Sequence, residues 1–183
     1  MSFRIRAAAD DDLPAITRIG GHYVVHSVAN FDLQPPPQTA WAHKLAEIVA
    51  DGLPFLVAEA EGAVVGYSYA SPWRVRPGYR YTVEDSVYIA PEALRQGLGR
   101  QLLGALIEAC ESIGKRQMVA VIVVEGGEAS VALHRAFGFR EVGVLEAVGF
   151  KEERWLDTVL MQRALGDGAA TPVGPAAPVE VSE

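Results

Sequence analysis

Hydrophobic and polar positions follow two different periods in the first third of the chain. Residues 3–8 alternate, with Phe3 and Ile5 on one face, and this predicts a short strand. The stretches 13–28 and 38–50 instead carry apolar side chains at helical spacing, so we expect two helices there. Three consecutive prolines keep the intervening loop out of regular structure. Phe31 is an apolar residue in this loop, where it either plugs the core or forms a wall of a substrate pocket.

From Pro54 onward the pattern is mainly that of strands separated by turns and two helices. A continuous apolar run at 118–124 is typical of a central strand buried on both faces. A polar turn containing Lys151–Glu153 is expected to separate the last two strands. The predicted elements are strands at 55–60, 63–73 and 81–89, a helix ending near 113, a strand at 118–124, a helix at 129–137, and strands at 140–148 and 155–163.

This order predicts a mixed α/β fold, with one mostly antiparallel sheet that carries helices on both faces. A single domain is expected over residues 1–165. The remainder, 166–183, is rich in glycine, alanine and proline and has no apolar period, so we expect it to be disordered.

Composition and charge narrow the functional classes. The net charge of -7 disfavours a nucleic-acid partner on electrostatic grounds. Cys110, the single cysteine, rules out an internal disulfide and a cysteine metal site, and its apolar surroundings favour a buried thiol over a nucleophile. No apolar run approaches the roughly 20 residues of a membrane helix, so a cytoplasmic protein without a membrane partner is expected.

The stretch Val83–Leu103 combines a strand, a glycine turn and a helix. Such a junction gathers unpaired backbone N–H groups at the positive end of a helix dipole, and glycine lets an anion approach the backbone. A P-loop is excluded because the chain lacks the G-x-x-x-x-G-K-[ST] motif. A dinucleotide fingerprint is incomplete, since Gly97 and Gly99 are followed by Leu102 where a third glycine would stand.

The surroundings of this turn resemble the GNAT acetyltransferase superfamily. The resemblance rests on Arg95-x-Gly97-x-Gly99, on the buried strand downstream, and on the motif LHRAFGF at 133–139, and it covers roughly residues 3–163. Further segments resemble the phosphinothricin and methionine sulfoximine/sulfone N-acetyltransferases within it: His22-Tyr23, Asn30-Phe31, Ser71–Arg74, Tyr81–Ile89, Val119–Ile122 and Trp155–Asp157.

The resemblance implies a GNAT-like fold, acetyl-CoA as cosubstrate, and a homodimer. It also implies that the turn binds the pyrophosphate of acetyl-CoA and that the preceding strand pairs with the pantetheine arm. No metal is expected, because His22, His26 and His43 form no metal-ligand spacing with acidic residues. Two positions depart from the family pattern: Leu94 replaces a Gln or Arg, and Gly127 replaces an Asn. The cofactor-binding residues expected on this basis are Val87, Tyr88, Ile89, Arg95, Gln96, Gly97, Leu98, Gly99 and Arg100.

Two residues are candidates for proton transfer. Acetylation of an amine requires the loss of an amine proton, and Glu84, a carboxylate in an apolar strand, is the expected base; the alternative is a solvated strand face. Asp85 points to the opposite face of a regular strand and is the weaker candidate. His134 lies where many members of the superfamily carry a tyrosine as general acid; the alternative is a helix histidine without chemistry.

The acceptor site is expected near the end of the strand at 63–73. Guanidinium groups bind carboxylates bidentately, so Arg74 and Arg76 are candidates for holding an amino-acid acceptor; the alternative is a solvated basic loop. Phe31, Glu84, Asp85 and Ser86 complete the expected substrate contacts. The predicted activity is direct acetyl transfer to a small amino acid or analogue. Transfer to a peptide N-terminus or polyamine, or acyl-CoA binding without turnover, remain alternatives.

Overall fold

The protein was analysed as a computed structural model that describes residues 3–174. The order of its helices and strands is the predicted one. The elements are β1 (Arg4–Ala7), α1 (Leu13–His26), α2 (Gln38–Ala50), β2 (Phe55–Ala60), β3 (Ala63–Pro72), β4 (Thr82–Ile89), α3 (Leu98–Ser112), β5 (Gln117–Val123), α4 (Glu128–Ala136), β6 (Arg140–Lys151) and β7 (Arg154–Ala164), with three short 3-10 turns.

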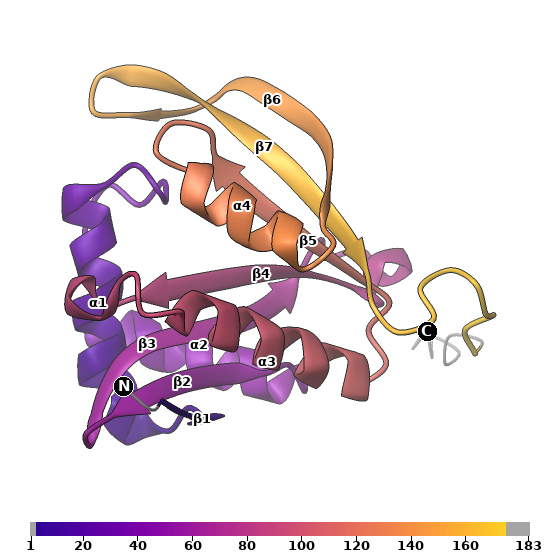
Figure 1. Cartoon of the computed structure of the whole chain (residues 1–183), viewed down its shortest axis with the longest axis horizontal. Coiled ribbons are helices and arrows are strands. Elements are labelled where there is room, and N and C mark those ends of the chain that lie inside the picture. Colours follow the sequence, from indigo (N-terminus) through magenta and orange to yellow (C-terminus); the bar gives the residue numbers. More distant parts are fainter. Residues whose placement is uncertain (1–2, 175–183) are drawn as a thin grey trace, which may run out of the picture.

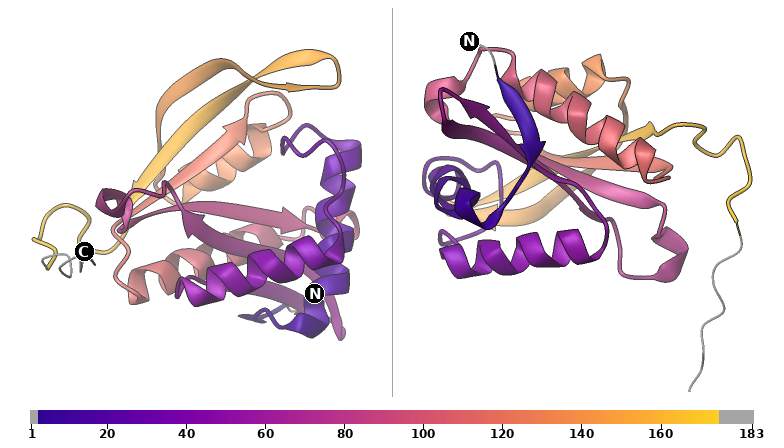
Figure 2. Two further views of the ribbon diagram at one scale, coloured as in Figure 1. Left: turned by 180° about the vertical axis from the view of Figure 1, so that it is seen from behind. Right: turned by 90° about the horizontal axis from the view of Figure 1, so that it is seen from below.

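The strands form one seven-stranded sheet in the order β1-β2-β3-β4-β5-β7-β6. The β4–β5 pair is parallel, and the other five neighbouring pairs are antiparallel. Helices α1 and α2 cover one face and α3 and α4 cover the other (Figure 1; Figure 2, right). The predicted mixed α/β fold, mostly antiparallel and covered on both faces, is thereby confirmed.

The parallel pairing between β4 and β5 is short. Thr82, Val83 and Glu84 pair with Gln117–Val119, and beyond Glu84 the two strands separate. Figure 1 shows β4 continuing toward α1 while β5, β7 and β6 turn away together. The sheet therefore consists of two halves that meet along three residue pairs, and the gap between them opens beside residues 85–89.

The core packs mainly against α3. Its side chains Leu102, Leu103 and Leu106 are fully buried against the sheet. Burial of a leucine side chain contributes about 1.5–3 kcal/mol, so this helix fixes β3 and β4 firmly. Cys110, on the same face of α3, is also fully buried, as its apolar surroundings predicted.

The last strand boundaries differ from the prediction. Strand β6 continues to Lys151, which was expected in a polar turn, and the Lys151 residue is only 6% exposed. The turn itself consists of Glu152 and Glu153, both with positive φ angles. The prediction was wrong because this lysine has partners outside the hairpin, which local polarity does not reveal.

The segment expected to be disordered lies partly outside the described residues. Residues 175–183 are not described. Residues 166–174 contain turns, in which the Gly168 N–H donates to Leu165 O and the Ala170 N–H to Asp167 O. Within residues 3–174, no helix is long and apolar enough to cross a membrane.

Candidate active site

Strand β4 presents different chemistry on its two faces. Tyr88 stacks on Tyr67 and makes an edge contact with Tyr23 of α1, so this face points toward α1 and α2. Glu84 and Ser86 alternate with Tyr88 and share that face. Asp85 points to the opposite face, toward α4, as the alternation predicts. The two adjacent carboxylates therefore belong to different environments.

Glu84 lies in a half-buried position next to the gap. It is directly opposite Ser71 in β3, and Ser86 is directly opposite Tyr69. Burial raises the pKa of Glu84, and the charge of Asp85 adds to the rise, while the positive charges of Lys44 and Arg74 oppose it. A carboxylate with a raised pKa and partial access to solvent is a suitable proton acceptor near neutral pH.

Two cations accompany Glu84. The Lys44 ammonium of α2 donates to the Tyr69 hydroxyl over 2.8 Å and sits 4.5 Å from the centre of the Tyr69 ring. Arg74 lies in the loop after β3, with its guanidinium 4.8 Å from the Trp73 ring. A single carboxylate flanked by two cations is arranged to receive a zwitterion, whose ammonium meets Glu84 and whose anionic group meets the cations.

Arg76, the second predicted arginine, has a different position. It is exposed at the start of the 3-10 turn Pro77–Tyr79, and no hydrogen bond or ion pair of its side chain occurs within residues 3–174. Arg74 acts on Glu84 electrostatically, whereas Arg76 is not among the charges that affect it. Of the two predicted arginines, only Arg74 therefore influences the charge of Glu84.

The glycine turn leaves donors free at the start of α3. Gly97 has a φ of 78° and precedes the helix without any side-chain cap, so the N–H groups of the first turn keep no side-chain partner. Gly99 serves packing instead: a Cβ there would lie 3.1 Å from Ile89 Cδ1. Arg95 and Arg100 are exposed beside these donors, and Arg100 stacks on Phe137. This arrangement suits a bound phosphate.

Of the other predicted cofactor contacts, Gln96 is exposed at the turn, Val87 and Ile89 pack toward α3, and Leu98 is buried, so that only its backbone faces the turn. Gly127, the position where the family pattern has Asn, is the residue immediately before α4. A Cβ there would come within 2.0 Å of the Val123 carbonyl oxygen, so glycine is required by close packing.

His134 and Asp85 form a buried pair between α4 and β4. The Nε2 atom of His134 is 2.9 Å from Asp85 Oδ2, and its Nδ1 atom is 2.7 Å from Ser130 O. Their side chains are 4% and 2% exposed. Because a carbonyl can only accept, Nδ1 carries a hydrogen, and one more proton lies between Nε2 and Asp85. Neither ring nitrogen is free to take a proton from an amine.

The structure shows where two predicted site residues lie. His134 was expected to exchange a proton with the reactants, and Asp85 to contact the acceptor; both side chains lie on the face of β4 opposite Glu84 and bond to each other. Burial opposes the charged imidazole, yet the bond to Asp85, its charge and the bond to Ser130 together raise the pKa of His134. Burial, with a contribution from Asp85, also raises the pKa of the nearby Cys110 thiol to about 12.

Lys44 and Tyr69 were not predicted as site residues. Lys44 follows Trp41 by three positions and so lies on the buried stripe of α2, a placement that was readable from the helical period. Beside it, a hollow of about 440 Å³ is lined by Lys44, Glu47, Ile48, Ala50, Asp51, Ser71 and Pro72. Another of about 400 Å³ lies at the opposite end of α3 from Gly97, against Lys115 and Arg116, away from the glycine turn.

The chain resembles known proteins in sequence and in structure. Residues 23–139 match the sequence profile of the acetyltransferase (GNAT) family. A phosphinothricin N-acetyltransferase from Alcaligenes faecalis is 50% identical over 91% of this chain and 85% of its own length. An L-methionine sulfoximine/L-methionine sulfone acetyltransferase from Salmonella typhimurium is 40% identical over 91% of this chain and 96% of its own length. The crystal structure of a phosphinothricin acetyltransferase from Sinorhizobium meliloti with acetyl-CoA matches this structure with a TM-score of 0.92 at 43% sequence identity. The match covers 99% of this chain and 98% of that one.

The buried pair predicts a pH-dependent stability difference. Asp85→Asn keeps the shape but removes the charge, and it should lower the free energy of unfolding by about 1.5–3 kcal/mol below pH 6. A raised His134 pKa stabilises the fold fully below the unfolded value near 6.5, and this contribution disappears as pH rises through the folded pKa. The difference between wild type and variant should therefore narrow toward pH 9, measured by urea unfolding.

The control for this measurement is Asp51→Asn, at an exposed position at the end of α2. Its effect on stability should be small at every pH. A difference in unfolding free energy between wild type and Asp85→Asn that stays constant from pH 5.5 to 9 would contradict the charged pair.

Proposed function

Because this chain belongs to the acetyltransferase (GNAT) family, we propose that it transfers the acetyl group of acetyl-CoA to the amine of a small amino acid or analogue. The acceptor class we propose is that of phosphinothricin and methionine sulfoximine or sulfone, the compounds named in its relatives. The observation that carries this proposal is Glu84, a half-buried carboxylate with a raised pKa beside two cations.

The chain's own residues fit acetyl-CoA. The uncapped start of α3, with the left-handed Gly97 and the exposed Arg95 and Arg100, offers N–H donors and positive charge to a pyrophosphate. Beyond Glu84, β4 has no strand partner on its β5 side, so backbone groups of Val87–Ile89 are available to an amide-bearing arm, except Ile89 O, which accepts from the Tyr23 hydroxyl. The cosubstrate would supply the activated acetyl thioester at the gap between the two halves of the sheet.

Glu84 provides the proton acceptor. The acceptor amine loses its proton to the carboxylate, directly or through one water, and its nitrogen then forms a bond to the acetyl carbon while the carbon–sulfur bond breaks. The departing thiolate takes up a proton from water, and Glu84 later releases the amine proton to solvent. Cys110 is buried with a strongly raised pKa, so direct transfer is favoured over an acyl-enzyme route.

Lys44 and Arg74 hold the acceptor's anionic group in this proposal. Both charges act on Glu84, so an acceptor that bridges them places its amine next to the base. Such charge-assisted contacts contribute about 1.5–3 kcal/mol each, enough to discriminate carboxylates from amides. A cationic polyamine is disfavoured by the same charges.

His134 and Asp85 act indirectly. The bond between them joins α4 to β4 across the opening gap, next to the last paired residue. We assign them the role of positioning residues that keep the two halves of the sheet at a fixed separation. Detoxification of herbicide-like amino acids is one consequence of the proposed activity. A cytoplasmic location is consistent with the need for acetyl-CoA.

The edge of the sheet supports a homodimer. Strand β6 is an edge strand, and its exposed apolar residues include Val144, Val148 and Phe150, with Trp155 next to them on β7. Exposed apolar edge strands invite pairing with another chain. Light scattering should give twice the chain mass of 19.6 kDa, and Val144→Glu should shift the protein toward the monomer. A monomeric wild type would refute the dimer.

An acceptor panel tests the function itself. Release of the CoA thiol from acetyl-CoA should occur with phosphinothricin, methionine sulfone and methionine sulfoximine. The amide of methionine sulfone should be at least about tenfold poorer in kcat/KM, because it lacks the carboxylate that two cations bind. Turnover of peptides or spermidine in preference to these amino acids would show that the acceptor belongs to another class. Thermal stabilisation by acetyl-CoA without any turnover would indicate a binding module.

Removal of the base should abolish most of the rate. Glu84→Gln should lower kcat/KM by about 10²–10⁴-fold. In the wild type, kcat/KM should fall as pH falls through the raised pKa of Glu84, since a protonated carboxyl cannot accept the amine proton, and the variant should lack this acid limb. Glu108→Gln, exposed on α3, is the control with near wild-type rates. More than a tenth of the rate in Glu84→Gln would exclude Glu84 as the base.

A further inference from the structure

The segment Tyr23–Phe31, here called the strap, crosses the gap between the two halves of the sheet. At its first end, the Tyr23 hydroxyl donates to Ile89 O over 2.8 Å, which ties the strap to β4. At its other end, Val28 packs with Val123 of β5 and Leu156 of β7. The strap is therefore the connection that joins β4 to the β5–β7 half on the face where Glu84 lies.

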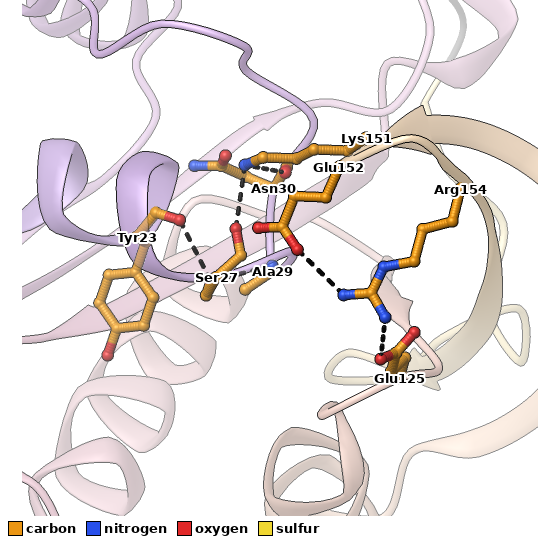
Figure 3. Close-up of polar contacts among 8 residues, drawn as sticks. All are labelled: Tyr23, Ser27, Ala29, Asn30, Glu125, Lys151, Glu152 and Arg154. Atoms are coloured by element: carbon orange, nitrogen blue, oxygen red, sulfur yellow. Dashed lines mark hydrogen bonds and ion pairs between the residues drawn. The ribbon is translucent and has the colours of Figure 1, made fainter.

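Lys151 anchors the far end of the strap (Figure 3). Its ammonium donates to Ser27 O over 2.9 Å and to Asn30 O over 3.1 Å. Within residues 3–174 no carboxylate lies within ion-pair distance of it. Burying a charge without an ionic partner is costly unless hydrogen bonds satisfy it. The two carbonyls supply these hydrogen bonds and so allow Lys151 to be only 6% exposed. The same hydrogen bonds fix the position of the strap at Ser27 and Asn30.

A second contact fixes the side chain that the strap carries. The Phe31 ring lies against Gly149, two residues before Lys151, and a Cβ at Gly149 would come within 2.2 Å of the ring. Gly149 has no positive φ, so its lack of a side chain serves this contact. Phe31 itself remains 39% exposed, which leaves one side of the ring open.

The strap also reaches the acceptor face of β4. Burial raises the pKa of Tyr88, the charge of Tyr69 adds to the rise, and the neighbouring Asn30 side chain opposes it, so Asn30 lies beside Tyr88. Asn30 Oδ1 is buried and has no hydrogen-bond partner among the described residues. Lys151 therefore controls the position of both Asn30 and Phe31 relative to the face that carries Glu84.

We propose that Lys151 is a positioning residue for the acceptor: it holds the strap so that Asn30 and Phe31 close the acceptor side of the gap. This inference rests on the proposed acetyl transfer. The hydrogen bonds of Lys151 go to Ser27 and Asn30 and not to the glycine turn at the start of α3, so we expect the binding of the acetyl-CoA pyrophosphate not to depend on it. Loss of the anchor affects acceptor affinity and leaves cofactor affinity unchanged.

The hairpin tip supplies a matched control. Arg154 lies three residues after Lys151, is exposed, and pairs with Glu125 and with Glu152 (Figure 3). It makes no contact with the strap in the described chain. Arg154→Gln therefore removes a charge from the same turn without releasing Ser27 or Asn30.

The test is steady-state kinetics of the full chain with methionine sulfone and acetyl-CoA. Lys151→Met should raise the KM for the acceptor at least tenfold and change the KM for acetyl-CoA less than twofold, while Arg154→Gln leaves both unchanged. Gly149→Ala, which displaces the Phe31 ring without touching Lys151, should also raise the acceptor KM. An unchanged acceptor KM, or an equal rise in both KM values, would overturn the proposal. Gly149→Ala decides the outcome if Lys151→Met does not fold.

A second readout separates this inference from the proposed function. Chymotrypsin cuts after aromatic residues and leucine, and Phe31 and Leu33 lie in and just after the strap. Cleavage there should be several-fold faster in Lys151→Met than in the wild type or Arg154→Gln. Wild-type protein that acetylates none of the panel would refute the proposed function, and equal cleavage rates would refute the anchor.

Discussion

The three residue pairs that join β4 to β5 form a short junction for a sheet of seven strands. Beyond Glu84 the backbone hydrogen bonds stop, and side chains must hold the two halves at a defined separation. On the α3 and α4 face this is done by the buried bond between Asp85 and His134. On the α1 and α2 face it is done by the strap, with Tyr23 on β4 and Lys151 on the hairpin. These two sets of side-chain contacts hold the halves of the sheet together where the backbone hydrogen bonds between β4 and β5 are missing, and so define the gap.

The charges around the gap are distributed according to how much water each one sees. Lys151 and the Asp85–His134 pair are almost completely buried, and the Lys151 ammonium, both His134 ring nitrogens and Asp85 Oδ2 have hydrogen-bond partners within the protein. Such groups are expensive to leave unsatisfied, so they are structural anchors. Glu84 is only half buried, and its pKa is raised without any partner that would hold its proton. In the proposed function, the neighbouring residues Glu84 and Asp85 of one strand therefore have different roles: the half-buried Glu84 accepts the proton, and the buried Asp85 holds the structure together.

The order of elements, the two faces of β4 and the glycine turn were predictable, because each depends on local periodicity or on backbone geometry. The partnership of Asp85 with His134 was not, since it joins residues 49 positions apart through the packing of α4 on β4. For the same reason a lysine in an apparently polar turn proved to be buried. Lys44 was closer to being predictable, because the stripe of α2 already included its position. Long-range partners, which no local pattern encodes, account for these differences.

The location of Cys110 has a practical consequence for studying this enzyme. Its thiol is fully buried, its pKa is raised to about 12, and the chain has no other cysteine. Only thiolates react readily with disulfide reagents, so Cys110 in the folded protein does not react with them. Colour development in a CoA-release assay then reports turnover without a protein background. Conversely, in the absence of CoA, the rate at which Cys110 becomes labelled measures how often the core between α3 and β4 opens, and the protein carries its own probe of that event.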